Sequence, residues 1–215
     1  MKKALVMLSG GMDSATALVE ATKAYRVSAI FFDYGQRSAD LDLTAARQIA
    51  RHFGVPLEVV DVSGLKRLFL GLKSAAIVAL GFKDVGDGMG AGNCPHGLFG
   101  VASTYCISAG IDVLISGMHA DDVIGLNNPA GYFSSWAAGM RDLQGVNFEF
   151  GLPYIEIGKA KVVKVGSSLG VPFELTRSCS SESVTHCGVC EPCKKRRSAF
   201  LEASIKDPTA YTQKI

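Results

Sequence analysis

The chain has little excess charge and no long apolar run. Its 215 residues carry 22 Lys and Arg against 20 Asp and Glu, and the formal net charge of +2 neither requires nor excludes a nucleic-acid partner. No apolar stretch reaches the roughly 20 residues that cross a bilayer, and the first apolar run is too short for a signal peptide. We therefore expect a cytoplasmic protein without a membrane partner.

The first turn of the chain also lacks the common nucleotide-binding patterns. A Walker A loop reads G-x-x-x-x-G-K-[ST], and a dinucleotide-binding loop reads G-x-G-x-x-G. The turn between the first apolar run and the amphipathic segment after it instead reads Ser9-Gly10-Gly11-Met12-Asp13-Ser14.

This hexapeptide is nevertheless suited to holding a phosphate. Gly10 and Gly11 tolerate a positive φ and let a ligand approach the backbone closely. A helix that opens at Asp13 or Ser14 presents free backbone N–H groups and the positive end of its dipole. The alternative is a plain tight turn in which Ser14 is the helix N-cap. The complete S-G-G-x-D-S pattern between a strand and a helix favours the phosphate cradle.

Hydrophobic periodicity predicts an α/β protein. Apolar, β-rich runs alternate with segments that repeat at helical spacing, which is typical of a parallel sheet with helices on both faces and ligands at the carboxyl edge of the strands. A glycine-rich stretch at 81–92 is expected to be a loop, either a linker or a lid over the nucleotide. We predict strands over 2–8, 27–32, 57–61 and 112–117, and helices over 13–22, 39–53, 98–109 and 132–143.

A cysteine cluster near the C-terminus predicts a metal site. The chain has six cysteines, and in a cytoplasmic protein they indicate metal binding or chemistry rather than disulfides. The spacing C-x7-C-x2-C-x2-C is typical of a tetrahedral zinc site. An iron–sulfur cluster is the alternative, although a ferredoxin run places its fourth cysteine downstream. We expect Cys106 to be a core residue, leave Cys94 open, and do not expect His186 to be a ligand. The predicted ligands are Cys179, Cys187, Cys190 and Cys193.

Three blocks of the sequence carry a resemblance to a known family. The hexapeptide at 9–14 is similar to the signature of the PP-loop ATP pyrophosphatases. The block F-F-D-Y-G-Q-R-S at 31–38 and the block at 153–179 that leads into the cysteines resemble the 7-cyano-7-deazaguanine synthase (QueC) family. The resemblance covers residues 1–60 and 95–203. It implies a Rossmann-like ATP-binding domain over 1–175, of the adenine nucleotide alpha hydrolase kind, with a zinc-binding segment over 176–215 packed on it.

The resemblance implies a reaction in three steps. ATP adenylates the carboxylate of 7-carboxy-7-deazaguanine, ammonia displaces AMP to form the amide, and a second ATP activates the amide so that it becomes the nitrile. The resemblance also implies structural zinc, Mg²⁺ with ATP, and a homodimer. Its expected partners are therefore a small-molecule carboxylate and ammonia, with no nucleic acid.

The resemblance assigns roles to named residues. Ser9, Gly10, Gly11, Asp13 and Ser14 would hold the phosphates, with Asp13 and Ser14 catalytic and Asp13 also placed to meet magnesium. Lys159 matches the lysine of the family's T-K-A-E block and would supply positive charge. Asp121, beside Asp122, is a candidate for magnesium or the substrate amine, or else a loop cap. Gln36 and Arg37 would contact the adenine, the ribose or the acyl substrate.

Some segments depart from the family pattern and keep two alternatives open. Residues 95–98 lack the arginine and asparagine of the family's P-x-R-N stretch, 125–139 replace its substrate segment, and Arg177 replaces a tryptophan. One alternative is a related ligase that acts on another carboxylate. The other is a tRNA-modifying adenylating enzyme, in which the basic run 194–197 would contact phosphates. We instead expect that run to be a solvated basic turn at the start of the last helix.

Overall fold

The computed structural model describes residues 1–65, 95–124 and 127–213. In this part of the chain, parallel strands form one five-stranded sheet in the order β3-β2-β1-β4-β5. The expected loop at 81–92 and Cys94 lie outside the described residues. The strands are β1 (Lys3–Met7), β2 (Arg26–Asp33), β3 (Leu57–Asp61), β4 (Val113–Ile115) and β5 (Glu149–Gly151).

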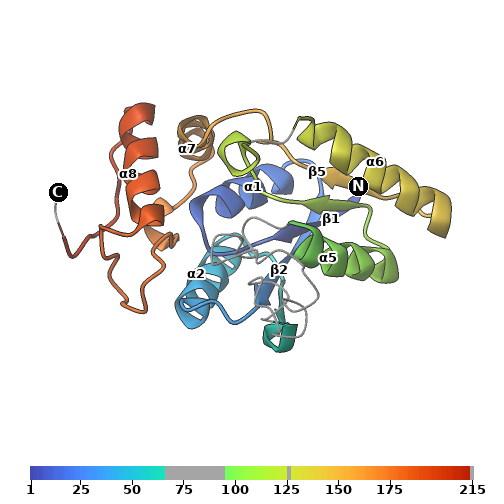
Figure 1. Cartoon of the computed structure of the whole chain (residues 1–215), viewed down its shortest axis with the longest axis horizontal. Coiled ribbons are helices and arrows are strands. Elements are labelled where there is room, and N and C mark those ends of the chain that lie inside the picture. The colour runs from blue at the N-terminus through green and yellow to red at the C-terminus, as the bar shows by residue number, and fades with distance from the viewer. Residues whose placement is uncertain (66–94, 125–126, 214–215) are drawn as a thin grey trace, which may run out of the picture.

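Helices cover both faces of the sheet, as predicted (Figure 1). Alternate residues of β1 point to opposite faces, so that Ala4 and Val6 pack in one apolar core and Leu5 in the other. The first core contains side chains of α1, α2, α7 and α8, and the second contains side chains of α5 and α6. The bounds are α1 (Met12–Thr22), α2 (Ala39–His52), α5 (Pro95–Ala109), α6 (Pro129–Gln144), α7 (Lys159–Ser168) and α8 (Glu191–Ala203).

The predicted elements are present with shifted ends, and strand β5 and helix α7 are additions that the periodicity did not predict. Strand β5 was not predicted, because its partly buried residues Glu-Phe-Gly form no apolar run, whereas the equally short β4 is a buried Val-Leu-Ile. Helix α1 begins at Met12, and its N-cap is Gly11. Ser14 lies inside the helix and donates its hydroxyl to the Gly11 carbonyl at 3.0 Å, so the alternative that made Ser14 the N-cap is wrong.

The strand order places a crevice beside the first loop. From β1 the chain passes outward to β2 and β3, and it then returns to lay β4 against the other side of β1. Connections leave the sheet in opposite directions at this point, which is where open α/β sheets bind ligands. Gly117, just after β4, packs so closely on α1 that a Cβ there would lie 2.4 Å from the Asp13 carbonyl oxygen.

Arg196 in α8 is fully buried, with 0% of its surface exposed. Its guanidinium donates to Thr176 Oγ1 at 2.7 Å and to the Phe173 carbonyl at 2.8 Å, and its Nε lies 3.4 Å from Asp207 Oδ1. The prediction of a solvated basic turn over 194–197 is therefore wrong for Arg196. A buried guanidinium is tolerated because acceptors surround it.

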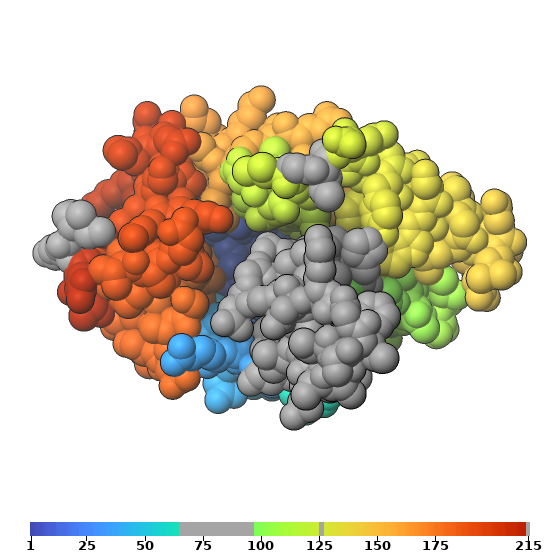
Figure 2. Space-filling model, in the orientation of Figure 1, coloured from blue at the N-terminus to red at the C-terminus, as the bar shows by residue number. Residues whose placement is uncertain are grey.

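The last residues fold back on α8 through Asp207. This carboxylate accepts the Tyr211 hydroxyl at 2.6 Å and the Thr209 N–H at 3.0 Å. Burial would raise the pKa of Asp207, but the hydrogen bonds from Thr209 and Tyr211 and the charge of Arg196 outweigh burial and lower it. Arg197 stacks over the Tyr211 ring at 3.9 Å. Figure 2 shows this segment at one end of the long axis and α6 at the other.

None of the helices in the described ranges is both long and apolar enough to span a membrane.

Candidate functional site

The loop between β1 and α1 is held open by its own hydrogen bonds. The Ser9 N–H donates to Ser14 Oγ at 3.2 Å, the two hydroxyl oxygens lie 3.1 Å apart, and the Gly11 N–H donates to Ser9 Oγ at 3.4 Å. Gly10 has φ +84°, and a Cβ at this position would lie 2.4 Å from the Asp42 carbonyl oxygen. Both facts require glycine there, and the result is a concave backbone at a helix N-terminus, as an anion site requires.

A compact group of charges borders this loop. Lys159, the first residue of α7, places its Nζ 2.5 Å from Asp13 Oδ2 and 3.3 Å from His119 Nε2. The Asp13 and Lys159 side chains are only 21% and 18% exposed. Asp13 Oδ1 is buried, and no group of the described residues forms a hydrogen bond with it. The structure therefore brings together two predicted residues that are 146 positions apart, and the second carboxylate oxygen of Asp13 faces His119 Nε2 at 3.9 Å.

The turn after β4 supplies two further carboxylates. Asp121 Oδ2 accepts the Lys159 backbone N–H at 2.9 Å, so that it caps α7, while Asp122 Oδ2 accepts the His119 N–H at 3.1 Å. His119 itself is 3% exposed, and its Nε2 lies 3.4 Å from Asp122 Oδ2. Both aspartates therefore have capping partners. Each also lines a cavity of about 400 Å³ that opens between α7 and α8.

Two cavities meet at Ser9, at the carboxyl edge of the sheet. One of about 300 Å³ lies between the first loop and the end of β4, and one of about 110 Å³ lies between the ends of β1 and β2. Figure 2 shows the N-terminal part of the chain, in blue, at the bottom of a hollow in this face. The larger cavity is lined by polar groups of Ser9, Asp13, Ser14, Ser116 and Asp122, and the smaller by Phe32, Tyr34, Gln36 and Asp42.

The structure separates the two residues predicted together after β2. Gln36 lines the smaller cavity, and its Oε1 accepts the Tyr34 N–H at 3.0 Å. Arg37 points to solvent with 85% of its side chain exposed, and its Nε lies 3.6 Å from Glu182 Oε1. Gln36 is thus placed to contact a ligand in this cavity, whereas Arg37 is paired with the loop that carries the cysteines.

A buried ion pair supports the wall of the smaller cavity. Arg177 Nε lies 3.5 Å from Asp42 Oδ1, and the two side chains are 6% and 19% exposed. Ser38 donates its hydroxyl to Asp42 Oδ2 at 2.7 Å. Burial raises the pKa of Asp42 to about 6, although the Ser38 hydrogen bond and the Arg177 charge oppose this shift.

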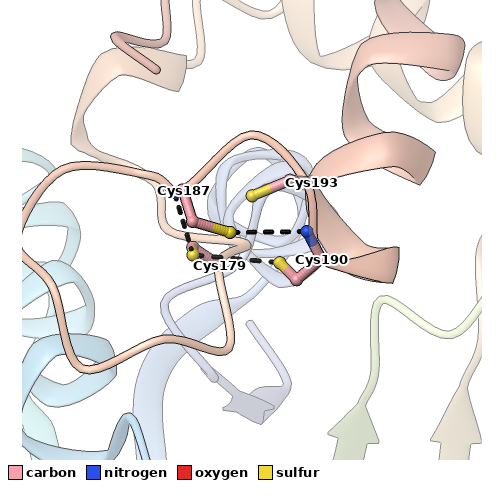
Figure 3. Close-up of side chains that lie close together, drawn as sticks. All are labelled: Cys179, Cys187, Cys190 and Cys193. Carbon is pink, nitrogen blue, oxygen red and sulfur yellow. Dashed lines mark hydrogen bonds between the residues drawn. The ribbon is translucent and has the colours of Figure 1, made fainter. Parts of the chain in front are cut away.

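The four predicted cysteines converge at the start of α8, whose first turn contains Cys193. Their Sγ atoms all lie within 4.8 Å of one another, and Figure 3 shows the sulfur atoms turned toward a common centre. Cys179 Sγ accepts the Cys187 N–H at 3.3 Å, and Cys187 Sγ accepts the Cys190 N–H at 3.4 Å. Backbone donors of this kind stabilise thiolates. These four residues can bind a metal ion, as the spacing predicted.

Other candidates lie outside the site. His186 does not belong to the sulfur group, because its Nε2 accepts the Ser178 N–H at 3.1 Å. Burial, together with the charges of Arg196 and Arg177, lowers the pKa of His186 to about 4. Cys106 is fully buried in the apolar core, as predicted, and burial raises the pKa of its thiol to about 12.

Four residues that the structure places in or beside the candidate site had no role in it assigned from the sequence. Ser116, His119, Asp42 and Arg177 lie at or beside the site, and none was assigned a role in it. A signal existed for the first two, because residues that directly follow a parallel strand lie at the ligand-binding edge. No local signal could pair Asp42 with Arg177, since only the fold brings α2 to the segment before the cysteines.

Comparisons with known proteins agree with this architecture. The family model described as "Queuosine biosynthesis protein QueC" matches residues 3–204. A 7-cyano-7-deazaguanine synthase of Methanospirillum hungatei is 33% identical over 221 residues, covering 97% of this chain and 99% of the relative. One of Coxiella burnetii is 33% identical over 233 residues and covers 100% of both chains.

Among solved structures, an NMN synthetase from Francisella tularensis is similar with a TM-score of 0.52 and 16% sequence identity. The similarity covers 95% of this chain and 78% of that one. At this level of identity the likeness concerns the fold alone.

Proposed function

The chain belongs to the QueC family of queuosine biosynthesis proteins, and we propose that it is a 7-cyano-7-deazaguanine synthase, an AMP-forming carbon–nitrogen ligase that uses ATP. Relatives that bear this name match it over almost their full length. In this proposal the enzyme adenylates the carboxylate of 7-carboxy-7-deazaguanine. Ammonia then displaces AMP to form the amide. A second ATP adenylates the amide oxygen with release of pyrophosphate, and AMP leaves with that oxygen as the nitrogen loses its protons, which gives the nitrile.

The observation that carries the proposal is the loop at 9–14. It combines a position that only glycine can occupy, a helix N-terminus and a lysine drawn in from α7. These are the donors and the charge that a triphosphate requires. ATP would place its phosphates in the cavity beside Ser14 and its base in the smaller cavity beside Gln36.

The residues of the chain fit the chemistry of adenylation. A carboxylate is a poor electrophile until one of its oxygens becomes part of a phosphate leaving group, and the pyrophosphate released at that step carries charge that fixed donors must stabilise. The Lys159 ammonium and the Ser9 and Ser14 hydroxyls would supply that stabilisation. Asp13 Oδ1, which forms no hydrogen bond within the described residues, would be a magnesium ligand, since Mg²⁺ binds carboxylate oxygens and nucleotide phosphates together.

We propose zinc as the metal of the four cysteines. Sulfurs bonded to one zinc ion at about 2.3 Å in a tetrahedron lie about 3.8 Å apart. The Cys179 and Cys190 sulfurs are 3.8 Å apart, and all four fall within 4.8 Å. In a four-iron cluster each thiolate binds a different iron, so that the cluster core holds the sulfurs further apart. With four protein ligands the ion has no open position, and its role would be structural.

Cys190→Ser tests the metal assignment. We expect one zinc ion per chain in the purified wild-type protein, less in the variant, and a lower unfolding midpoint, because metal binding contributes to folding. Cys106→Ala is the matched control, since it removes a buried thiol outside the cluster and should keep the zinc. Elemental analysis checks both variants. An iron content that follows the cysteines in place of zinc would contradict the proposal.

The burial of part of the basic run weakens the support for a tRNA-modifying enzyme, although Lys194 and Lys195 are exposed. Arg196 is buried, and Arg197 is held against Tyr211, so half of the basic run at 194–197 faces the protein. We accordingly propose a small-molecule carboxylate and ammonia as substrates and no nucleic-acid partner. The homodimer stays a prediction.

One assay tests the proposed function. The purified protein is incubated with ATP, Mg²⁺, an ammonium salt and 7-carboxy-7-deazaguanine, and AMP and the purine are followed by mass spectrometry. We expect AMP together with the nitrile, and we expect neither from Ser14→Ala. AMP formed with a different carboxylate, and none with this one, would refute the proposed substrate while keeping the adenylation.

A further inference from the structure

We infer that Arg177 is a positioning residue that transmits metal binding at the four-cysteine loop to the nucleotide cradle. The inference rests on the proposed function, since it takes the loop at 9–14 as the nucleotide site. Arg177 contacts three parts of the molecule at once: the cradle, the wall of the smaller cavity and the loop between the first two cysteines.

The first contact is to the cradle and uses the backbone. The Arg177 N–H donates to the Gly10 carbonyl at 2.8 Å. A Cβ added to Gly11 would lie 3.6 Å from the Arg177 carbonyl oxygen, so the two chain segments run against each other here. A displacement of Arg177 would therefore move or break its hydrogen bond to Gly10, the residue of the cradle that has a positive φ.

The second contact is to α2. The Arg177 guanidinium lies against Asp42, whose carboxylate lines the smaller cavity and whose carbonyl oxygen is the atom that excludes a side chain at Gly10. Both members of this pair are largely buried, and removing one partner of a buried pair leaves an uncompensated charge. Arg177 thus fixes the position of α2 relative to the cradle.

The third contact is to the metal loop. Arg177 Nη1 donates to the Val184 carbonyl at 3.2 Å, and Nη2 donates to the Ser181 carbonyl. Both carbonyls lie between Cys179 and Cys187, the first two metal ligands. A metal ion that ties these cysteines together fixes the path of the loop, and the loop then fixes the guanidinium. Without the metal, the loop can move and the guanidinium loses two of its acceptors.

A comparison of metal-bound and chelated protein tests this coupling. Wild type, Arg177→Met, Arg177→Lys and Arg197→Met are each measured with zinc and with a chelator. The first readout is hydrogen exchange of the amides at 9–14, which needs no nucleotide. The second is the affinity for a fluorescent ATP analogue. Trp136 lies in α6 on the opposite face of the sheet, and its fluorescence reports whether the whole fold persists.

In the wild type, we expect chelation to speed exchange at 9–14 and to weaken nucleotide binding about tenfold, a typical coupling between sites. In Arg177→Met the exchange should be fast with zinc bound, and chelation should weaken binding less than about twofold, because the coupling is already lost. Arg177→Lys keeps a charge beside Asp42 and should lie between these limits. Arg197→Met, which removes a guanidinium bonded to Gln213 on the other side of the loop, should resemble the wild type.

Two results would overturn the inference. One is wild-type exchange at 9–14 that does not respond to chelation while Trp136 fluorescence is unchanged. The other is a metal effect in both Arg177 variants as large as in the wild type. A wild-type protein that does not bind the nucleotide would refute the proposed function instead, and the exchange data would still decide the role of Arg177.

Discussion

Replacing Gly10 by alanine should damage both the stability of the protein and its cradle. The residue has φ +84°, a region that costs an L-residue about 1–2 kcal/mol. The new methyl group would lie 2.4 Å from the Asp42 carbonyl oxygen and 3.2 Å from the Ala45 Cβ, and overpacking of this kind costs about 1–3 kcal/mol. The sum predicts a loss of about 2–5 kcal/mol in the free energy of unfolding. A typical domain has about 5–15 kcal/mol in total, so this loss is a large fraction of it.

Gly54→Ala is the matched control. Gly54 follows α2 with φ +63°, and a Cβ there would meet no atom of the described residues within 4 Å. Only the backbone cost of about 1–2 kcal/mol applies to this variant. The difference between the two variants therefore isolates the close approach of the Asp42 carbonyl to Gly10, which the proposed cradle depends on.

Urea unfolding of the metal-bound variants measures both losses, and binding of the fluorescent ATP analogue at low temperature measures the cradle. Gly10→Ala should be the less stable variant by about 1–3 kcal/mol and should bind the analogue weakly. Gly54→Ala should bind it like the wild type. Equal stability of the two variants, or unimpaired binding by Gly10→Ala, would refute the packing argument.

Three further predictions follow from single contacts. Lys159→Met should lower AMP formation about 10²–10³-fold through the loss of one charged donor, while Lys161→Met should not, and steady-state rates compare them. Because the folded pKa of Asp207 is lowered, its carboxylate stabilises the fold above the unfolded pKa of about 3.9 and loses that effect as the pH falls through the folded value. The stability difference between wild type and Asp207→Asn should therefore be full near pH 7 and shrink below about pH 4, and constant urea midpoints would contradict this. The Cys106 thiol, whose pKa is raised to about 12, should react with a thiol reagent only after unfolding, as mass spectrometry of the labelled peptide can check.

What the sequence by itself determined is local. The turn at 9–14, the apolar runs of the strands and the spacing of the four cysteines each lie within one short stretch, where backbone preference and side-chain period act directly. The sheet with helices on both faces and the converging sulfurs were therefore predictable. Strand β5 was not, because its residues Glu-Phe-Gly lack the continuous apolar run that reveals β4.

Only the tertiary structure decided which distant groups meet. The order of strands in a sheet leaves no mark in the sequence of any one strand, yet it sets Lys159 against Asp13 and Arg177 against Asp42. The same holds for burial of charge: Arg196 stands in a basic run that looks solvated, and acceptors from two other segments make its burial tolerable. Whether a charged side chain faces water or the interior depends on partners that the fold supplies, and its neighbours in sequence do not determine them.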